Sequence, residues 1–425
     1  MSEPLSIATE PRAPAERAGS GSGSGSGSDP AAAASSSSAG RRHEAALETF
    51  VAGLGLDATW YARETEAAKK LKRYVRVNPR KTTVSKLLAK AAEGLVGAQA
   101  VEGCAGFLGL DGETRLKGVH AYEDGEVYGM DLASGLAVKA LALKPGMSAL
   151  DLCAAPGAKM CMMADEMEHK GLLVGVDASA HRSRTCASLL KKYRVAEKLE
   201  NWQCMLVEAD GVTFSHVEPL TIVWDNEADE MMCSAPPGGK RKRRLNKSGR
   251  RMLARRRLEN GVADASTVST AWEFDRVLVD AECTHDGSIK HMLKYAEGGF
   301  FGENALEEKF IGADLVKDST GAQTLEELQR GLLLNGFRRL APGGVLVYST
   351  CSFSEAQNEN IVRYLLEHAE FAPQARLEDL DACAMFQCAS PLSSKSLPGT
   401  LRFTPTHSGT SGLFLAKISK QSKAT

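Results

Sequence analysis

Short runs of apolar residues alternate with longer stretches of helical spacing from about residue 129 onward. Such runs are typical of strands that are buried on both faces of a parallel sheet. Five of these runs end in small or polar residues, at 148–154, 171–179, 203–211, 274–283 and 343–351. The alternation predicts a doubly wound α/β sheet that binds its ligands at the carboxyl ends of the strands. Two further apolar runs within 400–419 predict an antiparallel hairpin.

The part of the chain in front of this sheet has a different pattern. Residues 73–94 pass from a short apolar strand to an amphipathic helix, and Pro79 separates the two. Short strand-like runs follow as far as about residue 130. We therefore expect a small α+β subdomain over 45–130, with an RNA-binding type of sequence, and the main domain over 131–420.

Two segments lack any periodicity. Residues 1–44 are rich in Ser, Gly and Ala, which predicts a disordered tail. The segment at about 225–270 interrupts the alternation between the third and fourth runs and predicts a disordered insertion. A second, better ordered insertion is expected over 287–321.

The composition is that of a soluble globular protein, with 43% apolar and 25% charged residues. No run reaches the roughly 18 apolar residues that a membrane span needs, so we expect no membrane segment. The acidic N-terminus argues against a secretory signal. The ten cysteines have irregular spacing and form no C-x-x-C pair. We therefore expect reduced thiols in an intracellular protein, and no metal site.

The net charge of −1 conceals a segregated basic segment. Residues 240–257 hold eleven of the 52 basic residues and no acid, which leaves 41 basic against 53 acidic residues elsewhere. One interpretation is a solvated loop that is inert or serves as a nuclear address. The other is a flexible arm that contacts phosphates. A charge run alone favours the first interpretation.

Residues suited to a ligand follow three successive strands. The sequence from Asp151 to Lys159 is a turn of small residues that leads into a helix, so backbone N–H groups can approach a carboxylate or phosphate. Asp177 ends the second strand, where a carboxylate can accept from both ribose hydroxyls. Asp210 ends the third. Each acid alone is better explained as a helix cap or a solvated turn residue. Together they indicate an adenosine ligand with an attached anion.

The fourth and fifth strands each end near a cysteine, Cys283 and Cys351. If the first strand lies beside the fourth and the fourth beside the fifth, both thiols face the nucleotide crevice. A thiolate is accessible near neutral pH and adds readily to electron-poor carbon. Small buried cysteines are common in cores. We assign that role to seven of the remaining cysteines: Cys104, Cys161, Cys186, Cys204, Cys233, Cys383 and Cys388.

Several ordered motifs resemble the Sun-type (Fmu/nucleolar-protein) RNA cytosine-5 methyltransferases. They are DLCAAPGAK, the two strand-ending aspartates, LVDAEC and GFRRLAPGGVLVYSTCSFSEAQNEN. The resemblance extends to RVNPRKTTVSKLL, which is similar to an RNA-binding lead-in, to GEVYGMDLASGLAVKALALKPG, and to RFTPTHSGTSGLFLAKI near the end. It covers roughly residues 70–420 outside the basic insertion.

The resemblance implies a Rossmann-like class I methyltransferase sheet that forms 5-methylcytosine with S-adenosylmethionine as cofactor. The residues implied in cofactor binding are Cys153, Ala154, Ala155, Pro156, Gly157, Ala158, Lys159, Asp177, Arg182, Asp210 and Asp280. Cys351 is the implied nucleophile that adds to carbon 6 of cytosine. Asp280, oriented by Lys159, would hydrogen-bond ring nitrogen 3. Cys283 would help to release the methylated base.

The sequence departs from the family pattern beside the fourth strand. Glu282 stands where the family usually has Pro, Ala158 where it has Gly, and Met160 where it has Thr or Ser. A carboxylate next to Cys283 should raise the pKa of that thiol, which favours Cys351 as the nucleophile. The rival assignment, as in DNA cytosine methyltransferases, makes Cys283 the nucleophile. The run Cys-Thr-His-Asp is nearer to the family's organellar branch.

The leading hypothesis is an RNA cytosine-5 methyltransferase that acts on transfer or ribosomal RNA and needs no obligate protein partner. The first alternative is a catalytically weak RNA-binding assembly factor on the same fold. The second, a methyltransferase for a small molecule or a protein, would not need nucleophilic thiols. The basic segment favours the nucleus or nucleolus, whereas the variant motif and the N-terminal tail leave an organelle open.

Overall fold

In the computed structural model, the described residues all belong to one compact unit, 46–425. The structure describes residues 49–90, 95–195, 197, 199–215, 221–225, 272–296 and 324–422. The predicted tail and basic segment lie outside the described residues. So do nearly all of the first predicted insertion and most of the second.

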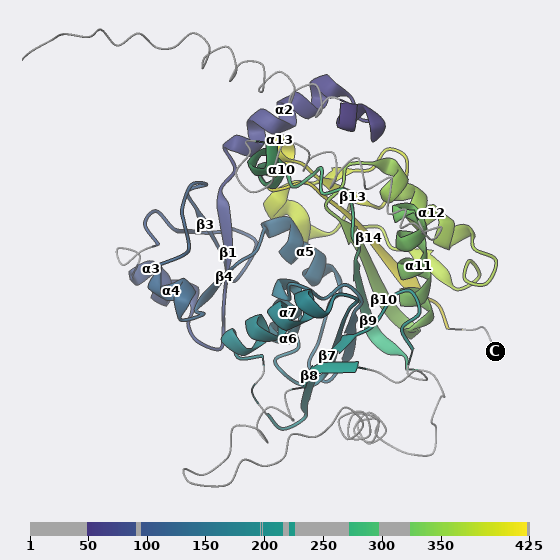
Figure 1. Cartoon of the computed structure of the whole chain (residues 1–425), viewed down its shortest axis with the longest axis horizontal. Coiled ribbons are helices and arrows are strands. Elements are labelled where there is room, and N and C mark those ends of the chain that lie inside the picture. Colours follow the sequence, from purple (N-terminus) through teal and green to yellow (C-terminus); the bar gives the residue numbers. More distant parts are fainter. Residues whose placement is uncertain are drawn as a thin grey trace, which may run out of the picture. The chain divides into compact units, whose positions relative to one another are not determined.

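A ten-stranded mixed sheet forms the larger part of this unit, and its order is β12-β13-β14-β10-β9-β5-β6-β7-β8 with β11 beside β14 (Figure 1). The parallel strands are β5 (Ser148–Asp151), β6 (Gly171–Asp177), β7 (Trp202–Glu208), β9 (Phe274–Asp280) and β10 (Leu340–Thr350). The antiparallel strands are β8 (Thr221–Asp225), β11 (Ala375–Leu377), β12 (Leu392–Ser393), β13 (Leu401–Phe403) and β14 (Leu413–Lys420).

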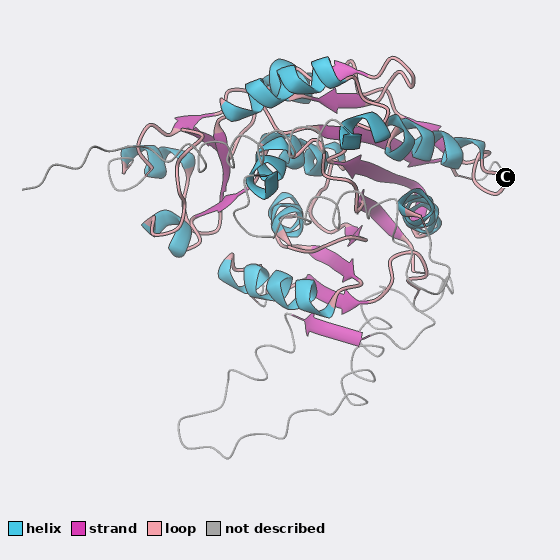
Figure 2. Ribbon diagram, turned by 45° about the horizontal axis from the view of Figure 1, so that its top comes forward, coloured by secondary structure: helices cyan, strands magenta, loops and turns pink. Residues whose placement is uncertain are grey.

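Helices cover both faces of this sheet (Figures 1 and 2). The helices on one face are α5 (Leu132–Ala140), α6 (Ala158–Glu166) and α7 (Ala180–Lys192), and those on the other are α11 (Leu325–Arg338) and α12 (Glu359–Glu367). Successive residues of a central strand take part in different cores: Leu278 packs with the first set of helices, and Val277 and Val279 with the second. Burial on both faces explains why these strands are continuously apolar.

A separate four-stranded antiparallel sheet has the order β2-β3-β1-β4. Its strands are β1 (Arg73–Val77), β2 (Gln99–Ala100), β3 (Phe107–Leu110) and β4 (Val127–Gly129), and it carries α3 (Val84–Ala89) and α4 (His120–Glu123). The helix α2 (Ala58–Lys69) packs instead against α10 (Ile289–Ala296) and α13 (Pro405–Ser408). Residues 45–130 thus contribute to three different cores, and their assignment to one subdomain stays a prediction.

The predicted strand positions and the order of the first, fourth and fifth strands are confirmed, because β9 lies between β5 and β10. The C-terminal hairpin is confirmed as β13 and β14, with α13 between them. The pattern did not predict β8, β11 or β12, which are short strands at or beside the antiparallel edges. None of the helices in the described part of the chain is long and apolar enough to cross a membrane.

Gly135 lies where the helix α5 packs against the four-stranded sheet, with no room for a side chain. It lies in α5, and a Cβ atom there would be 2.2 Å from Cζ of the buried Phe107. We expect Gly135→Ala to destabilise the fold by about 1–2 kcal/mol, because overpacking costs more than the roughly 1 kcal/mol gained from replacing a helical glycine. Urea unfolding measures the change.

The control is Gly53→Ala, at an exposed helical glycine with open space around it. This substitution should be neutral or stabilising. Equal effects of the two substitutions would contradict the packing argument.

Candidate active site

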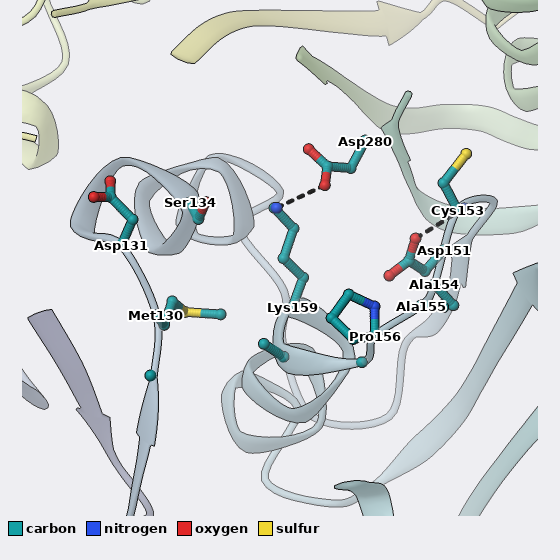
Figure 3. A pocket seen from close by; sticks show the side chains of 13 residues that line it. Met130, Asp131, Ser134, Asp151, Cys153, Ala154, Ala155, Pro156, Lys159 and Asp280 are labelled. Atoms are coloured by element: carbon teal, nitrogen blue, oxygen red, sulfur yellow. Dashed lines mark hydrogen bonds and ion pairs between the residues drawn. The ribbon is translucent and has the colours of Figure 1, made fainter. Parts of the chain in front are cut away.

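The loop after β5 is held in shape by its own carboxylate and by the neighbouring strand (Figure 3). The Asp151 carboxylate accepts from the N–H of Cys153 at 3.2 Å, and the N–H of Ala154 donates to Val176 at 2.9 Å. Gly157 then caps α6 with a φ of 106°, and a Cβ atom there would lie 2.7 Å from the Cys186 sulfur. Only glycine meets both constraints, so the backbone turns sharply and directs the first N–H groups of α6 toward the loop.

Asp177 fixes this loop from the end of β6. Its carboxylate accepts from the N–H groups of Ala155 at 3.2 Å and Ser179 at 3.0 Å. The Arg182 guanidinium lies 3.6 Å from the same carboxylate and donates to the Ala155 carbonyl at 3.1 Å. Asp177 is 4% exposed. Its geometry makes it a structural acceptor for the loop, and its predicted part in binding a ribose stays a prediction.

A cavity of about 200 Å³ opens over the loop. It is lined by Gly129, Met130, Asp131, Ser134, Asp151, Cys153, Ala154, Ala155, Pro156, Gly157, Ala158, Lys159 and Asp280. The whole predicted stretch from Cys153 to Lys159 therefore shares one cavity with Asp280. Asp210 does not line it: this residue is exposed, and its carboxylate accepts from the N–H of Val212 at 2.9 Å.

The analysis of the sequence missed the wall of the cavity that precedes α5. Asp131 caps α5 by accepting from the N–H of Ala133 at 3.0 Å, and its other oxygen accepts from Ser411 at 3.1 Å. Burial raises the pKa of Asp131. The signal in the sequence was segment 125–146, which contains Asp131 and resembles the family's entry to the catalytic domain. That resemblance by itself gives Asp131 no role.

An ion pair crosses the cavity between α6 and β9 (Figure 3). The Lys159 ammonium lies 2.6 Å from one oxygen of Asp280, and the Ser349 hydroxyl donates to the other oxygen at 2.7 Å. Burial acts to lower the pKa of Lys159, but Asp280 outweighs it and the pKa is raised. Lys159 is thus held charged, and both side chains are fixed in direction.

Asp151 is buried beneath this ion pair. Burial, followed by the negative charge of Asp280, raises the pKa of Asp151 to about 7. The carboxyl group therefore changes its charge close to neutral pH, at the wall of the cavity.

Two thiols meet at the ends of β9 and β10. The sulfur atoms of Cys283 and Cys351 are 3.2 Å apart, and Nδ1 of His285 lies 3.0 Å from the Cys351 sulfur. The hydrogen bond from Cys283 lowers the pKa of Cys351 well below its usual value; burial opposes this shift, and His285 adds to it. The same hydrogen bond, together with burial, raises the pKa of Cys283. The two shifts favour ionisation of Cys351 before that of Cys283.

The loops that carry the thiols are bound to one another by buried polar groups. Gly287 donates to the Cys351 carbonyl at 2.8 Å, and a Cβ atom on Gly287 would lie 2.7 Å from that oxygen. The Asp286 carboxylate accepts from the N–H of Phe353 at 2.6 Å. The Gln357 side chain accepts from the N–H of Thr284 at 3.1 Å. This network sets the separation of the two sulfur atoms.

The Glu282 carboxylate, which was expected to raise the pKa of Cys283, contacts other residues. The Glu282 carboxylate pairs with Arg182 at 3.1 Å and with Nε2 of His285 at 3.4 Å. These partners lower the pKa of Glu282, the His285 hydrogen bond most. The pKa of Cys283 is raised as expected, but by Cys351 and burial, so the physical reason given from the sequence was wrong.

Among the described residues, the ligand-type atoms of Cys283, His285 and Cys351 lie within 4.8 Å of one another. Two sulfurs and one imidazole nitrogen form a set that suits a soft or borderline metal ion. The prediction that the chain has no metal site stays a prediction.

The fold and the cavity define a class I methyltransferase. A family model described as "16S rRNA methyltransferase RsmB/F" matches residues 138–236 and 311–419. This match, together with the relatives below, confirms the predicted Sun-type relationship, the fold class and S-adenosylmethionine as the cofactor of the family.

Two curated relatives match more than half of the chain. The chain is 27% identical to a "Probable ribosomal RNA small subunit methyltransferase B" of Bacillus subtilis over 84% of its own length and 63% of the relative. It is 30% identical to the "5-cytosine rRNA methyltransferase NSUN4" of Xenopus laevis over 57% of its length and 43% of the relative. The chain thus spans less than two thirds of these curated relatives. The crystal structure of NSun6 from Pyrococcus horikoshii, with SFG, superposes with a TM-score of 0.57 and 17% identity over 88% of this chain and 97% of the other.

The raised pKa of Asp151 predicts a pH-dependent stability. A carboxyl group whose pKa is about 7 in the fold and about 4 when unfolded stabilises the fold at low pH, and this contribution is lost as the pH rises through 7. Asparagine keeps the acceptor for Cys153 and cannot ionise. We expect Asp151→Asn to gain about 1–3 kcal/mol relative to the unchanged protein between pH 5 and pH 8, measured by urea unfolding.

The matched control is Asp111→Asn. Asp111 is exposed, and its carboxylate accepts from the N–H two residues ahead, Glu113, at 2.9 Å, as Asp151 does. This variant should follow the unchanged protein at both pH values. A parallel pH response of the two asparagine variants would refute the assignment of the buried proton to Asp151.

Proposed function

We propose that this protein transfers a methyl group from S-adenosylmethionine to carbon 5 of a cytosine in RNA. The observation that carries the proposal is the thiol pair at the ends of β9 and β10, next to an aspartate that lines the cavity. Methyl transfer to nitrogen or oxygen needs no nucleophilic cysteine. The low pKa of Cys351 and its position beside Asp280 fit addition to a pyrimidine ring.

The loop from Cys153 to Gly157, the N-terminus of α6 and Asp177 would hold the cofactor. These groups fit it because they combine a closely approached backbone, free helix N–H groups and buried carboxylates. When bound, the cofactor supplies an electrophilic methyl group on a sulfonium. The half-buried Asp131 and the buried Asp151 line the same cavity and, when ionised, favour a positively charged ligand.

The residues of the chain would do the remaining chemistry. The Cys351 thiolate would form a bond to carbon 6 of the ring while a proton held between Asp280 and ring nitrogen 3 offsets the negative charge that develops on that nitrogen. Lys159 and Ser349 would orient the Asp280 carboxyl group for this contact. Carbon 5 then becomes electron-rich and takes the methyl group. Solvent water would then take the proton from carbon 5, and the electron pair of that C–H bond restores the ring double bond as Cys351 leaves as a thiolate. Cys283, whose sulfur lies 3.2 Å away, would assist this last step by donating a hydrogen bond to the departing thiolate.

The target cytosine must leave its stack to reach Cys351, which suits loops of transfer or ribosomal RNA. Two arginines of the predicted RNA-binding segment are already engaged. Arg76 is 7% exposed and pairs with Glu166 at 3.5 Å, and Arg80 pairs with Glu197. Exposed Arg73 and the segment 240–257, outside the described residues, are the further candidates for phosphate contacts. The predicted nuclear or organellar location stays a prediction.

The two thiols should behave differently when replaced. We expect Cys351→Ala to abolish methylation and any covalent protein–RNA adduct, because the nucleophile is lost. Cys283→Ala should still add to the base and then accumulate an adduct that survives a denaturing gel, because release is slowed. Transfer of labelled methyl groups and gel retardation of RNA measure the two effects. Both variants should bind S-adenosylmethionine normally in calorimetry.

Cys383→Ala is the matched control, since this half-buried cysteine lies outside the cavity and the thiol pair. It should methylate and release RNA like the unchanged protein. An adduct in Cys351→Ala and none in Cys283→Ala would reverse the assigned roles. Cofactor binding without methyl transfer to any RNA would favour the assembly-factor alternative.

A further inference from the structure

His285 occupies a position between the nucleophile and an acid. Its Nδ1 is 3.0 Å from the Cys351 sulfur, and its Nε2 is 3.4 Å from the Glu282 carboxylate. The two ring nitrogens therefore face a proton donor on one side and a proton acceptor on the other. This is the arrangement in which an imidazole takes a proton from a nucleophile while an acid orients the ring.

The backbone holds the ring in this place. His285 has a φ of 59°, in the left-handed region that non-glycine residues seldom adopt. Its carbonyl accepts from the N–H of Ser288 at 2.8 Å, which closes the turn. A conformation of this kind persists where the surroundings enforce it.

Glu282 is itself oriented from two sides. Its carboxylate is bound by Arg182 at 3.1 Å, and its backbone carbonyl accepts from the buried Gln329 side chain at 2.7 Å. Glu282 and His285 are three residues apart, and both lie in the segment where the sequence departs from the family pattern. The glutamate that replaces the usual proline thus has a partner in the histidine.

We propose that His285, oriented by Glu282, takes the proton of Cys351 and keeps this cysteine as a thiolate paired with an imidazolium. The proton moves from the Cys351 sulfur to Nδ1, while the N–H at Nε2 donates to the Glu282 carboxylate. No other reactant is required. Glu282 is a positioning residue, because it acts through the imidazole. The use of this thiolate in methyl transfer rests on the proposed function. Its formation by proton transfer to His285 does not depend on that function.

The charges around the pair agree with this assignment. Hydrogen bonds to Cys351 and Glu282 raise the pKa of His285 to about 10, against the effect of burial. Lys159 is the second cation whose charge acts on Cys351. Asp286 is the opposing acid: it is fully buried, and burial raises its pKa, which reduces its negative charge. On the side of α2, the Tyr61 hydroxyl donates to the Asp286 carbonyl at 2.8 Å, and burial keeps Tyr61 neutral by raising its pKa.

Alkylation by iodoacetamide tests the inference without RNA or cofactor. Only the thiolate reacts, so the rate followed from about pH 5 to pH 10 reports its population. Trypsin places the two cysteines in separate peptides, 277–290 for Cys283 and 340–363 for Cys351, which mass spectrometry quantifies independently. We expect Cys351 in the unchanged protein to react at nearly constant rate down to below pH 7.

His285→Gln keeps a polar side chain and removes the base. We expect Cys351 in this variant to react about tenfold or more slowly at pH 6.5 and to recover as the pH rises toward 9. Glu282→Gln should give a smaller shift in the same direction, which also covers the case that the first variant does not fold. His181→Gln, at an exposed histidine of α7, is the matched control and should leave the profile unchanged.

Profiles of His285→Gln and Glu282→Gln that coincide with the unchanged protein would overturn the inference. Methylation of RNA by the same variants is a separate measurement. A thiolate-dependent defect should be relieved at pH 9, whereas damage to the fold would persist at every pH. If the unchanged protein methylates no RNA but the alkylation profile still shifts, the proposed function fails and the imidazole–thiolate pair stands.

Discussion

The site depends on the parallel register between β9 and β10, which pairs Asp280 with Ser349. The register has two consequences. It allows the Ser349 hydroxyl to orient the Asp280 carboxylate, and it brings the chain to Cys351 two residues after Ser349 while the chain of β9 reaches Cys283 three residues after Asp280. A shift by one residue would turn the aspartate to the opposite face of the sheet and separate the thiols. The pairing of two apolar strands therefore sets the spacing of the polar groups.

The charged side chains of the site form two series of neighbouring groups in which positive and negative charges alternate. In one, Lys159 pairs with Asp280; in the other, Arg182, Glu282 and His285 lead to Cys351. Arg182 connects the second chain to the cofactor loop because it also donates to the Ala155 carbonyl. A half-exposed ion pair contributes little to stability by itself. Here the ion pairs serve to orient the side chains, because each partner holds the next one in place.

The strands and the loop after β5 could be predicted because buried apolar runs and a small-residue turn are local signals. The antiparallel strand β8 could not be predicted, because its five residues adjoin a region without periodicity. Its pairing with β7 depends on tertiary contacts that the local sequence does not show. The same limit applies to Asp131. It reaches the cavity through the packing of α5, and nothing in its neighbours distinguishes it from an ordinary helix cap. Conversely, Asp210 has the sequence context of a ligand but lies exposed outside the cavity.

Glu282 shows why a charge next to a thiol in the sequence does not determine the pKa of that thiol. From the sequence alone, the Glu282 carboxylate is expected to act on Cys283, the next residue in the chain. In the folded chain the carboxylate points to Arg182 and His285, and Cys283 is governed by the sulfur 3.2 Å away. One shared proton between two thiols raises the pKa of one and lowers that of the other. The imidazole of His285 lies closer to Cys351 than to Cys283, at 3.0 against 3.9 Å, so it decides which of the two becomes the anion.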